Sequence, residues 1–291
     1  WRIDFKNANG GMAGSGARLA HISAPDANGD LVAADKRKFF YAPDVSLIKD
    51  FQFSDKAAAY DVLIMVSGDR SAPNSDVAHN RIYMFRDYVI SGTIYNETLL
   101  AAPADGDPEY RRFVDSLTED DLYNATLNTI QNEDGSLDAD EVTDLRAKDG
   151  WYINLHDGTT DDGIDEDWVG EKGLSEPAIL SGFVILTTYL PAGEAVENND
   201  VICASPIEGN GRVYAMSLLT GEAVFSSWED SVDTYERGDR VYNRSLTGIP
   251  SSPVIRMTKK GPQILIGGGG GILEIDANIS LPIVRSSWKE L

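Results

Sequence analysis

The sequence predicts an all-β protein, because short β-branched or aromatic runs dominate it and an internal repeat relates several of them. Turn-forming Gly, Pro, Asn or Asp residues bound the runs, as is typical of strands. Helical periodicity is confined to Thr118–Gln131, which begins with a potential capping box, and the acidic stretch Ala139–Arg146 is a second candidate for a short helix. The clearest strand candidates are Tyr60–Ser67, Arg81–Phe85, Trp151–Leu155, Phe183–Tyr189, Gly211–Met216, Pro253–Met257 and Gln263–Ile266.

The internal repeat consists of a Pro-led strand, an apolar run, and a third strand ending in a short apolar motif. Copies begin at Pro43, Pro177 and Pro253, and the segment Trp1–Asp4 reads as the tail of a fourth. Radially repeated antiparallel units of this kind form β-propellers, whose blades cover one another's apolar faces. We therefore expect residues 1–291 to be the C-terminal part of one seven- or eight-bladed propeller whose upstream part is absent. Residues 88–150 would be an acidic, partly helical insertion; unrelated hairpins in a β-sandwich are the alternative.

The strongly negative net charge argues against two classes of binding partner. The 291 residues contain 25 Lys and Arg against 47 Asp and Glu, which gives a formal net charge of −22. Nucleic-acid binding and docking on anionic lipid both need clustered cations, so we expect neither. No run approaches the roughly 20 apolar residues of a membrane helix, so we expect no membrane insertion. The charge instead favours solubility and cation binding.

The best cation-binding candidate is an acidic loop that ends at Glu141. Numbered as an EF-type loop from Ile130, it offers oxygen atoms at several ligand positions, with Gly135 at the sixth position, where a sharp turn is needed. Ile130 supplies no side-chain oxygen at the first position, so the pattern is incomplete. Loops at Asp26–Asp30 and Asp157–Asp167 fit less well, and solvated acidic turns are the alternative for all three. The predicted Ca²⁺ ligands are Asn132, Asp134, Ser136, Asp138 and Glu141.

The tripeptide Arg237-Gly238-Asp239 is the sequence that integrins bind, and it lies in a polar connection. Short tripeptides arise often by chance, so the alternative is a turn with a local charge pair. An extracellular integrin- or glycan-binding module is therefore one alternative function.

Catalytic patterns are weaker. Gly211–Phe225 resembles a quinoprotein blade repeat, in which Thr220-Gly221 forms a tight turn, so a quinoprotein-type periplasmic dehydrogenase is another alternative. The chain has one cysteine, Cys203, and three histidines, with no nucleophile-elbow motif. Gly267–Gly271 lacks the Lys-Ser or Lys-Thr of a phosphate loop and indicates a crowded turn. We therefore expect no enzymatic activity.

A family resemblance covers the whole chain in order. The segments Phe39–Pro43, Tyr60–Pro73 and Asn80–Asp87 are similar to the C-terminal propeller of the PilY/PilC family, type IV pilus tip and biogenesis proteins. Further matches are Leu122–Thr126, Gly150–Leu155, Gly170–Lys172, Cys203–Gly221 and Ser287–Leu291.

The resemblance implies a secreted protein at the pilus tip, on the outer membrane and cell surface of a Gram-negative bacterium. Its work would be non-catalytic: fimbrium biogenesis, in which it supports pilus extension against retraction, and cell adhesion. Minor pilins would dock on it, and host-cell or abiotic surfaces would be bound through a missing N-terminal region. Ca²⁺ would modulate this work, although the family's best-known Ca²⁺ loop would lie upstream of Trp1.

Overall fold

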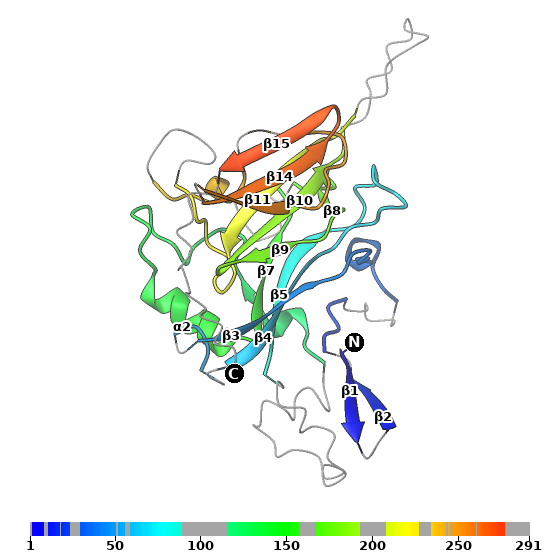
Figure 1. Ribbon diagram of the computed structural model, residues 1–291, viewed down its shortest axis with the longest axis vertical. Helices are drawn as coiled ribbons and strands as arrows, with labels where there is room; N and C mark the ends of the chain where they lie inside the picture. The colour runs from blue at the N-terminus through cyan, green and yellow to red at the C-terminus, as the bar shows by residue number, and fades with distance from the viewer. Residues whose placement is uncertain are drawn as a thin grey trace, which may run out of the picture.

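The chain folds mainly into β-sheets with a few short helices, as a computed structural model shows (Figure 1). No helix among the described residues is long and apolar enough to span a bilayer. The structure describes residues 2–8, 11–17, 19–23, 30–50, 52–55, 59–88, 116–157, 167–192, 208–226, 234–242, 244, 246–259 and 261–276.

The first sheet has the strand order β3-β4-β5-β7-β6. Its first four strands pair antiparallel, and β6 adds to β7 in parallel. Residues 116–149, the described part of the predicted insertion, supply β6 and the helices η4 (Glu119–Asp121) and α2 (Ala139–Ala147). The strands are β3 (Asp44–Lys49), β4 (Ala59–Val66), β5 (Arg81–Asp87), β6 (Tyr123–Asn124) and β7 (Gly150–Asn154).

The second sheet has the order β12-β11-β10-β8, with β9 also paired to β10, and the third sheet is the meander β13-β14-β15. A separate hairpin joins β1 to β2, and η1 (Ala33–Asp35) and η5 (Gly238–Arg240) are single 3₁₀ turns. These strands are β1 (Arg2–Ala8), β2 (Gly11–Ala17), β8 (Lys172–Gly173), β9 (Ala178–Leu180), β10 (Phe183–Leu190), β11 (Asn210–Ser217), β12 (Leu246–Thr247), β13 (Val254–Thr258), β14 (Gly261–Gly268) and β15 (Gly271–Asp276).

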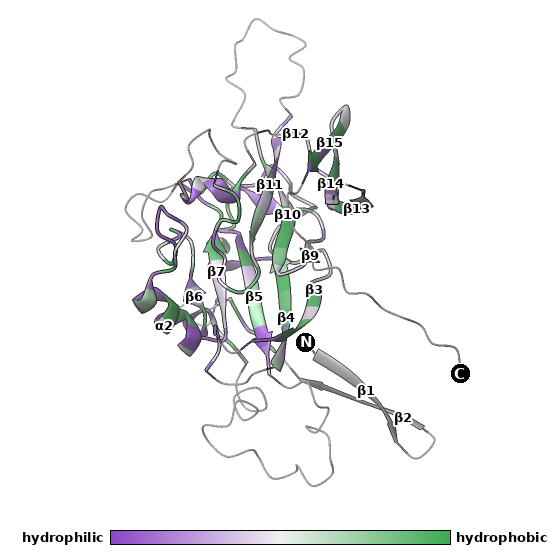
Figure 2. Ribbon diagram, turned by 60° about the vertical axis from the view of Figure 1, so that its left-hand side comes forward, coloured by the Kyte–Doolittle hydropathy of each residue, from purple (hydrophilic) through white to green (hydrophobic). Residues whose placement is uncertain are grey.

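The three larger sheets pack face to face in chain order. One core joins the first and second sheets and contains Ile64, Trp151 and Leu186; a second joins the second and third sheets and contains Ile185 and Ile264. Figures 1 and 2 show the third sheet against the second and the second against the first. Among the described residues the sheets form an open stack and no closed ring or barrel.

The predicted repeat corresponds to one meander per sheet: β3-β4-β5, β9-β10-β11 and β13-β14-β15. The all-β class is therefore confirmed. Gly221 has φ +72° and its N–H donates to the Ser217 carbonyl at 2.9 Å, which confirms the Thr-Gly turn. The Gly267–Gly271 segment forms the tight β14–β15 hairpin turn. The segment predicted as the tail of a fourth copy lies in β1, which pairs with β2, and its place in a further repeat stays a prediction.

The helix predicted at Thr118–Gln131 is wrong. The capping box between Thr118 and Asp121 forms, but the helix ends after one 3₁₀ turn. The Asn124 Oδ1 then accepts hydrogen bonds from the Thr126 N–H at 3.0 Å and its hydroxyl at 2.6 Å. Such side-chain bonds compete with helical backbone bonds. The helix predicted at Ala139–Arg146 is confirmed as α2.

Candidate functional site

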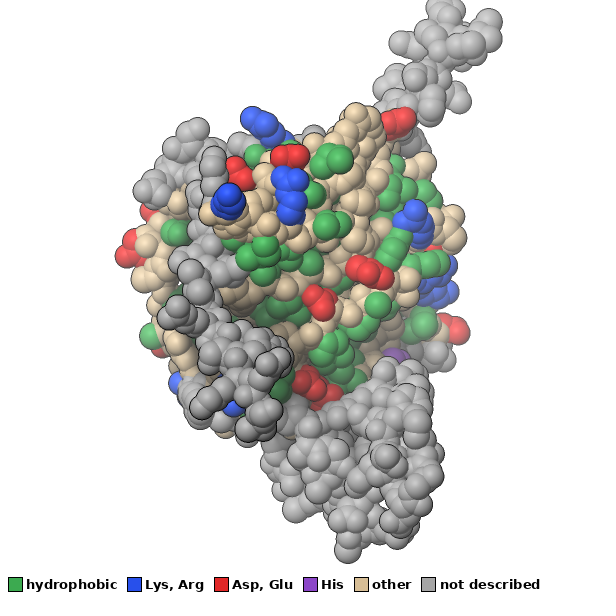
Figure 3. Space-filling model, in the orientation of Figure 1, with side chains coloured by type: hydrophobic (Ala, Val, Ile, Leu, Met, Phe, Trp, Pro, Cys, Tyr) green, Lys and Arg blue, Asp and Glu red, His purple; other side chains and the backbone are tan. Residues whose placement is uncertain are grey.

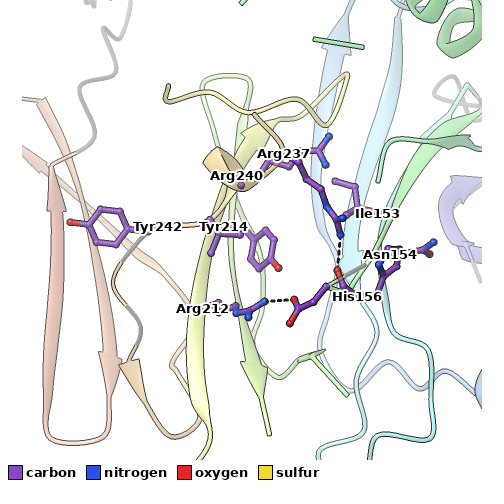
Figure 4. Close-up of a pocket in the computed structure, with 11 residues that line it drawn as sticks. Ile153, Asn154, His156, Arg212, Tyr214, Arg237, Arg240 and Tyr242 are labelled. Carbon is purple, nitrogen blue, oxygen red and sulfur yellow. Dashed lines mark hydrogen bonds and ion pairs between the residues drawn. The ribbon is translucent and has the colours of Figure 1, made fainter. Parts of the chain in front are cut away.

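A cavity of about 540 Å³ lies where the end of β7 meets β11 and η5 (Figure 4). The first sheet supplies Ile153, Asn154 and the following His156 and Asp157. The second sheet and η5 supply the basic and aromatic wall, which consists of Arg212, Tyr214, Arg237, Gly238, Arg240, Val241 and Tyr242. We call this cavity the arginine pocket.

Glu171 organises one side of the arginine pocket from behind its wall. This glutamate is 2% exposed, and its carboxylate accepts hydrogen bonds from the Tyr214 hydroxyl at 2.8 Å and the Thr188 hydroxyl at 2.5 Å. Its second oxygen pairs with the Arg212 guanidinium at 2.7 Å, and Arg212 also contacts Asp157 at 3.3 Å. Since a buried carboxylate is costly unless it is paired, these contacts fix the position of Arg212.

Burial and charge set the protonation states on this wall. Burial alone would lower the pKa of Arg212, but Glu171, Tyr214 and Asp157 together raise it above the usual value. Burial raises the pKa of Tyr214 well above the usual value, and the Glu171 charge adds to that shift. Both groups therefore act as hydrogen-bond donors at neutral pH.

Arg240 holds η5 against the turn that follows β6. It is 2% exposed, and its guanidinium donates to the Ala125 carbonyl at 2.7 Å, the Thr126 carbonyl at 2.9 Å and Asn128 Oδ1 at 3.0 Å. Its Nε is buried with no hydrogen-bond partner. Burial, followed by repulsion from Arg237, lowers the pKa of Arg240 below its usual value.

The segment Arg237-Gly238-Asp239 lies on the edge of the arginine pocket. Arg237 donates to the His156 carbonyl at 2.6 Å, which ties η5 to the end of the first sheet. Asp239 is 2% exposed, and its carboxylate accepts from the Glu236 N–H at 2.9 Å. The Asp239 carboxylate is thus turned into the chain, whereas integrin recognition requires this group at the surface.

The predicted Ca²⁺ ligands have separate tasks within the chain. Asp134 Oδ1 accepts from the Ser136 N–H at 2.9 Å and its hydroxyl at 2.6 Å, and Asn132 Nδ2 donates to the Ser136 hydroxyl at 3.1 Å. Asp138 caps α2, accepting from the Asp140 and Glu141 N–H groups. Glu141 instead accepts from the Tyr123 hydroxyl at 2.6 Å.

Within the described part of the chain, no three His, Cys, Asp or Glu side chains gather as a metal site would require. The Ca²⁺ loop stays a prediction. The loop at Asp26–Asp30, most of Asp157–Asp167, and Cys203 lie outside the described residues.

Two of the three histidines are packed on Trp168. The His79 ring stacks on it at a centroid distance of 4.0 Å, and the His156 ring meets its edge at 5.2 Å. These contacts give both imidazoles a packing role between strands.

Sequence reasoning singled out Arg237 and Gly238 as a candidate integrin motif but missed the other residues that build the arginine pocket. The signal available was a charged side chain inside an apolar strand pattern, as Arg212 is within Gly211–Met216. Buried charges of this kind need a partner, but the sequence does not show that the partner of Arg212 is Glu171.

Comparisons with known proteins add a similarity to a solved structure. No protein-family model matches the chain, and no curated protein matches it. A solved structure, the C-terminal domain of PilY1 from Pseudomonas aeruginosa, superposes with a TM-score of 0.47 and 14% sequence identity. The similarity covers 88% of this chain and 47% of that one, so this chain spans about half of the solved domain.

Proposed function

We propose that the three sheets are consecutive blades of a larger β-propeller, and that this propeller is a non-catalytic binding platform of the type IV pilus tip. The observation that carries the proposal is the repeated packing of one meander on the next in chain order. Propeller blades pack in this way, each covering the apolar face of its neighbour.

The outer faces of the stack support the propeller. On the first sheet, Val45 and Leu47 are 52% and 58% exposed. On the third sheet, Val254, Met257 and Ile272 are 59%, 61% and 70% exposed. Figure 3 shows apolar side chains scattered among charged ones across one view of the molecule. Further blades on both sides would cover such residues, as the middle sheet is covered here.

The pilus assignment rests on the sequence segments that resemble the PilY/PilC family. We propose that the platform acts in pilus extension against retraction and in adhesion at the cell surface, with minor pilins as partners. A rigid stack of sheets suits this work, because a pilus tip carries traction while its loops supply recognition.

A deletion in the source bacterium tests the proposal. We expect removal of the coding region to reduce the number of surface pili seen by electron microscopy, and expression of the intact gene in trans to restore it. Pilus numbers that stay unchanged in the deletion strain would contradict the assembly role.

A second assay addresses the dehydrogenase alternative. The purified chain is incubated with pyrroloquinoline quinone and Ca²⁺, and alcohols or sugars are offered with an electron-accepting dye. We expect no dye reduction above the quinone-free control. Substrate-dependent turnover would overturn the non-catalytic assignment.

A further inference from the structure

The arginine pocket concentrates positive charge in a chain whose net charge is −22. Three guanidinium groups line it, from Arg212, Arg237 and Arg240, against one carboxylate, Asp157, among the described lining residues. Glu171 lies behind Arg212, and Asp239 is folded into the adjacent turn. The cavity wall itself therefore presents mainly hydrogen-bond donors with positive charge.

Arg240 adds a buried positive charge to the wall of the arginine pocket. It forms no ion pair with the described part of the chain, and carbonyl and amide oxygens take its terminal N–H groups while its Nε has no partner. The Glu222 carboxylate attracts Arg240 without an ion pair, yet burial still lowers the pKa of Arg240. An anion that entered the cavity would further favour the charged guanidinium. Because Arg240 is 2% exposed, it would act mainly through its field, with direct contacts left to the other two arginines.

The wall favours a carboxylate over a phosphate. Arg212 pairs through one terminal nitrogen with Glu171 at 2.7 Å and Asp157 at 3.3 Å. The same two acids would repel a dianion more strongly than a monoanion. The volume of about 540 Å³ lies within the range of small-ligand sites, and Ile153, Val241 and Tyr242 offer surface for an attached apolar group.

We propose that the arginine pocket binds a carboxylate carried by a peptide, either a free C-terminus or an Asp or Glu side chain of a protein partner. Tyr and Arg, which make up much of the wall, are the residue types that dominate protein–protein contacts. The choice of a peptide over other carboxylates rests on the proposed role as a protein-binding platform. Arg237 and Arg212, already held by the His156 carbonyl and Glu171, would receive the carboxylate in fixed positions.

Isothermal titration of the purified chain with matched pentapeptides tests this. One peptide has a free C-terminus and no acidic side chain, the second is its C-terminal amide, and the third is an amide with a central Glu. We expect at least one acidic peptide to bind and the neutral amide to bind at least tenfold more weakly. Binding of the first peptide identifies a chain terminus, and binding of the third identifies a side chain.

Two arginine variants distinguish binding in the arginine pocket from nonspecific attraction of acidic peptides to surface charge. Arg237→Gln keeps a donor for the His156 carbonyl but removes the charge, and should weaken binding about tenfold or more. Arg256→Gln removes an exposed arginine from the third sheet and should leave binding unchanged. Circular dichroism checks that each variant folds. Should Arg237→Gln fail to fold, Arg237→Lys, which keeps the charge and loses the planar fork, should weaken binding by a smaller factor.

Three results would overturn the inference: no binding by either acidic peptide, equal binding of the neutral amide, or binding only of galacturonate or inorganic phosphate offered as separate probes. The pilus proposal fails separately. If deletion lowers pilus number but acidic peptides do not bind, the pocket inference alone is wrong. If acidic peptides bind but pilus number is independent of the protein, the pilus assignment alone is wrong.

Discussion

The junction between the first and second sheets is built around large aromatic side chains, whereas the junction between the second and third is built from aliphatic ones. Trp151, Tyr60 and Tyr214 belong to the first core, and the Trp151 indole N–H donates to the Leu218 carbonyl at 3.1 Å across the junction. The second core contains only Ile, Val and Ala among its buried members, represented by Ile185 and Ile264. The first junction therefore buries more apolar surface.

The strands also differ in how continuously their residues are buried. β10 is buried along six consecutive residues, from Val184 to Tyr189, because sheets cover both of its faces. β5 in the first sheet is also buried along six residues, because a third core that includes Leu19 and Leu117 covers its other face. β4 alternates between buried and half-buried positions throughout, and β14 does so along most of its length. The half-buried positions of these two outer strands are nevertheless partly apolar, as Leu63 and Met65 show on β4. Leu63 and Met65 pack against the third core, so the second face of the first sheet is partly covered within this chain.

The contrast between the junctions is tested most strongly at Trp151. Trp151→Ala should lower the free energy of unfolding by about 3–5 kcal/mol, because it leaves a large cavity and an unpaired carbonyl at Leu218. Urea unfolding followed by circular dichroism measures the change. Trp151→Phe keeps most of the volume and should cost less than Trp151→Ala. A loss below about 1 kcal/mol for Trp151→Ala would show that this junction is not the main source of stability.

Truncating a buried side chain in the junction between the second and third sheets should lower the free energy of unfolding by less. Ile264 is fully buried on β14, and Ile264→Ala should cost about 2–3 kcal/mol. Hydrogen exchange should then show faster opening of β13–β15 than of β4 and β5, since the aliphatic junction holds the third sheet and the aromatic junction holds the first. Ile272→Ala, at a residue 70% exposed on the adjacent strand, is the matched control and should change stability by less than about 0.5 kcal/mol. Equal acceleration across all sheets would mean that they unfold as one unit.

The strands of both junctions could be predicted from the sequence, because β-branched and aromatic runs between turn residues are a local signal. The failed helix at Thr118–Gln131 shows where local patterns end: Asn124 captures the backbone at Thr126, and Asn128 adopts φ +60°. The arginine pocket was not predictable, since Glu171 and Arg212 meet only through the pairing of β8, β10 and β11. Because Glu171 and Arg212 are 41 residues apart, no periodic pattern in the sequence shows that they pair.

Lys172 makes a polar contact across the junction between the first and second sheets. It is 1% exposed on β8, and its ammonium donates to the Pro73 and Ser75 carbonyls, which follow β4 in the first sheet, at 2.5 and 2.6 Å. Burial lowers its pKa to about 8, with Asp76 and Asp69 opposing the shift. The folded chain therefore binds fewer protons than the unfolded chain between pH 8 and about 10.5, so this lysine makes stability rise with pH in that interval.

Over pH 8 to 9.5 the expected gain is about 1–2 kcal/mol, since the two carbonyl bonds favour the charged form and offset part of the burial cost. The upper limit of this interval avoids the buried tyrosines, because burial raises the pKa of Tyr60 and Tyr83 above 10 and their effect has the opposite sign at higher pH. Denaturant unfolding at several pH values measures the slope, and Lys172→Met should flatten it. A slope that persists unchanged in Lys172→Met would assign the pH dependence to other groups and leave Lys172 as a fully charged anchor between the two sheets.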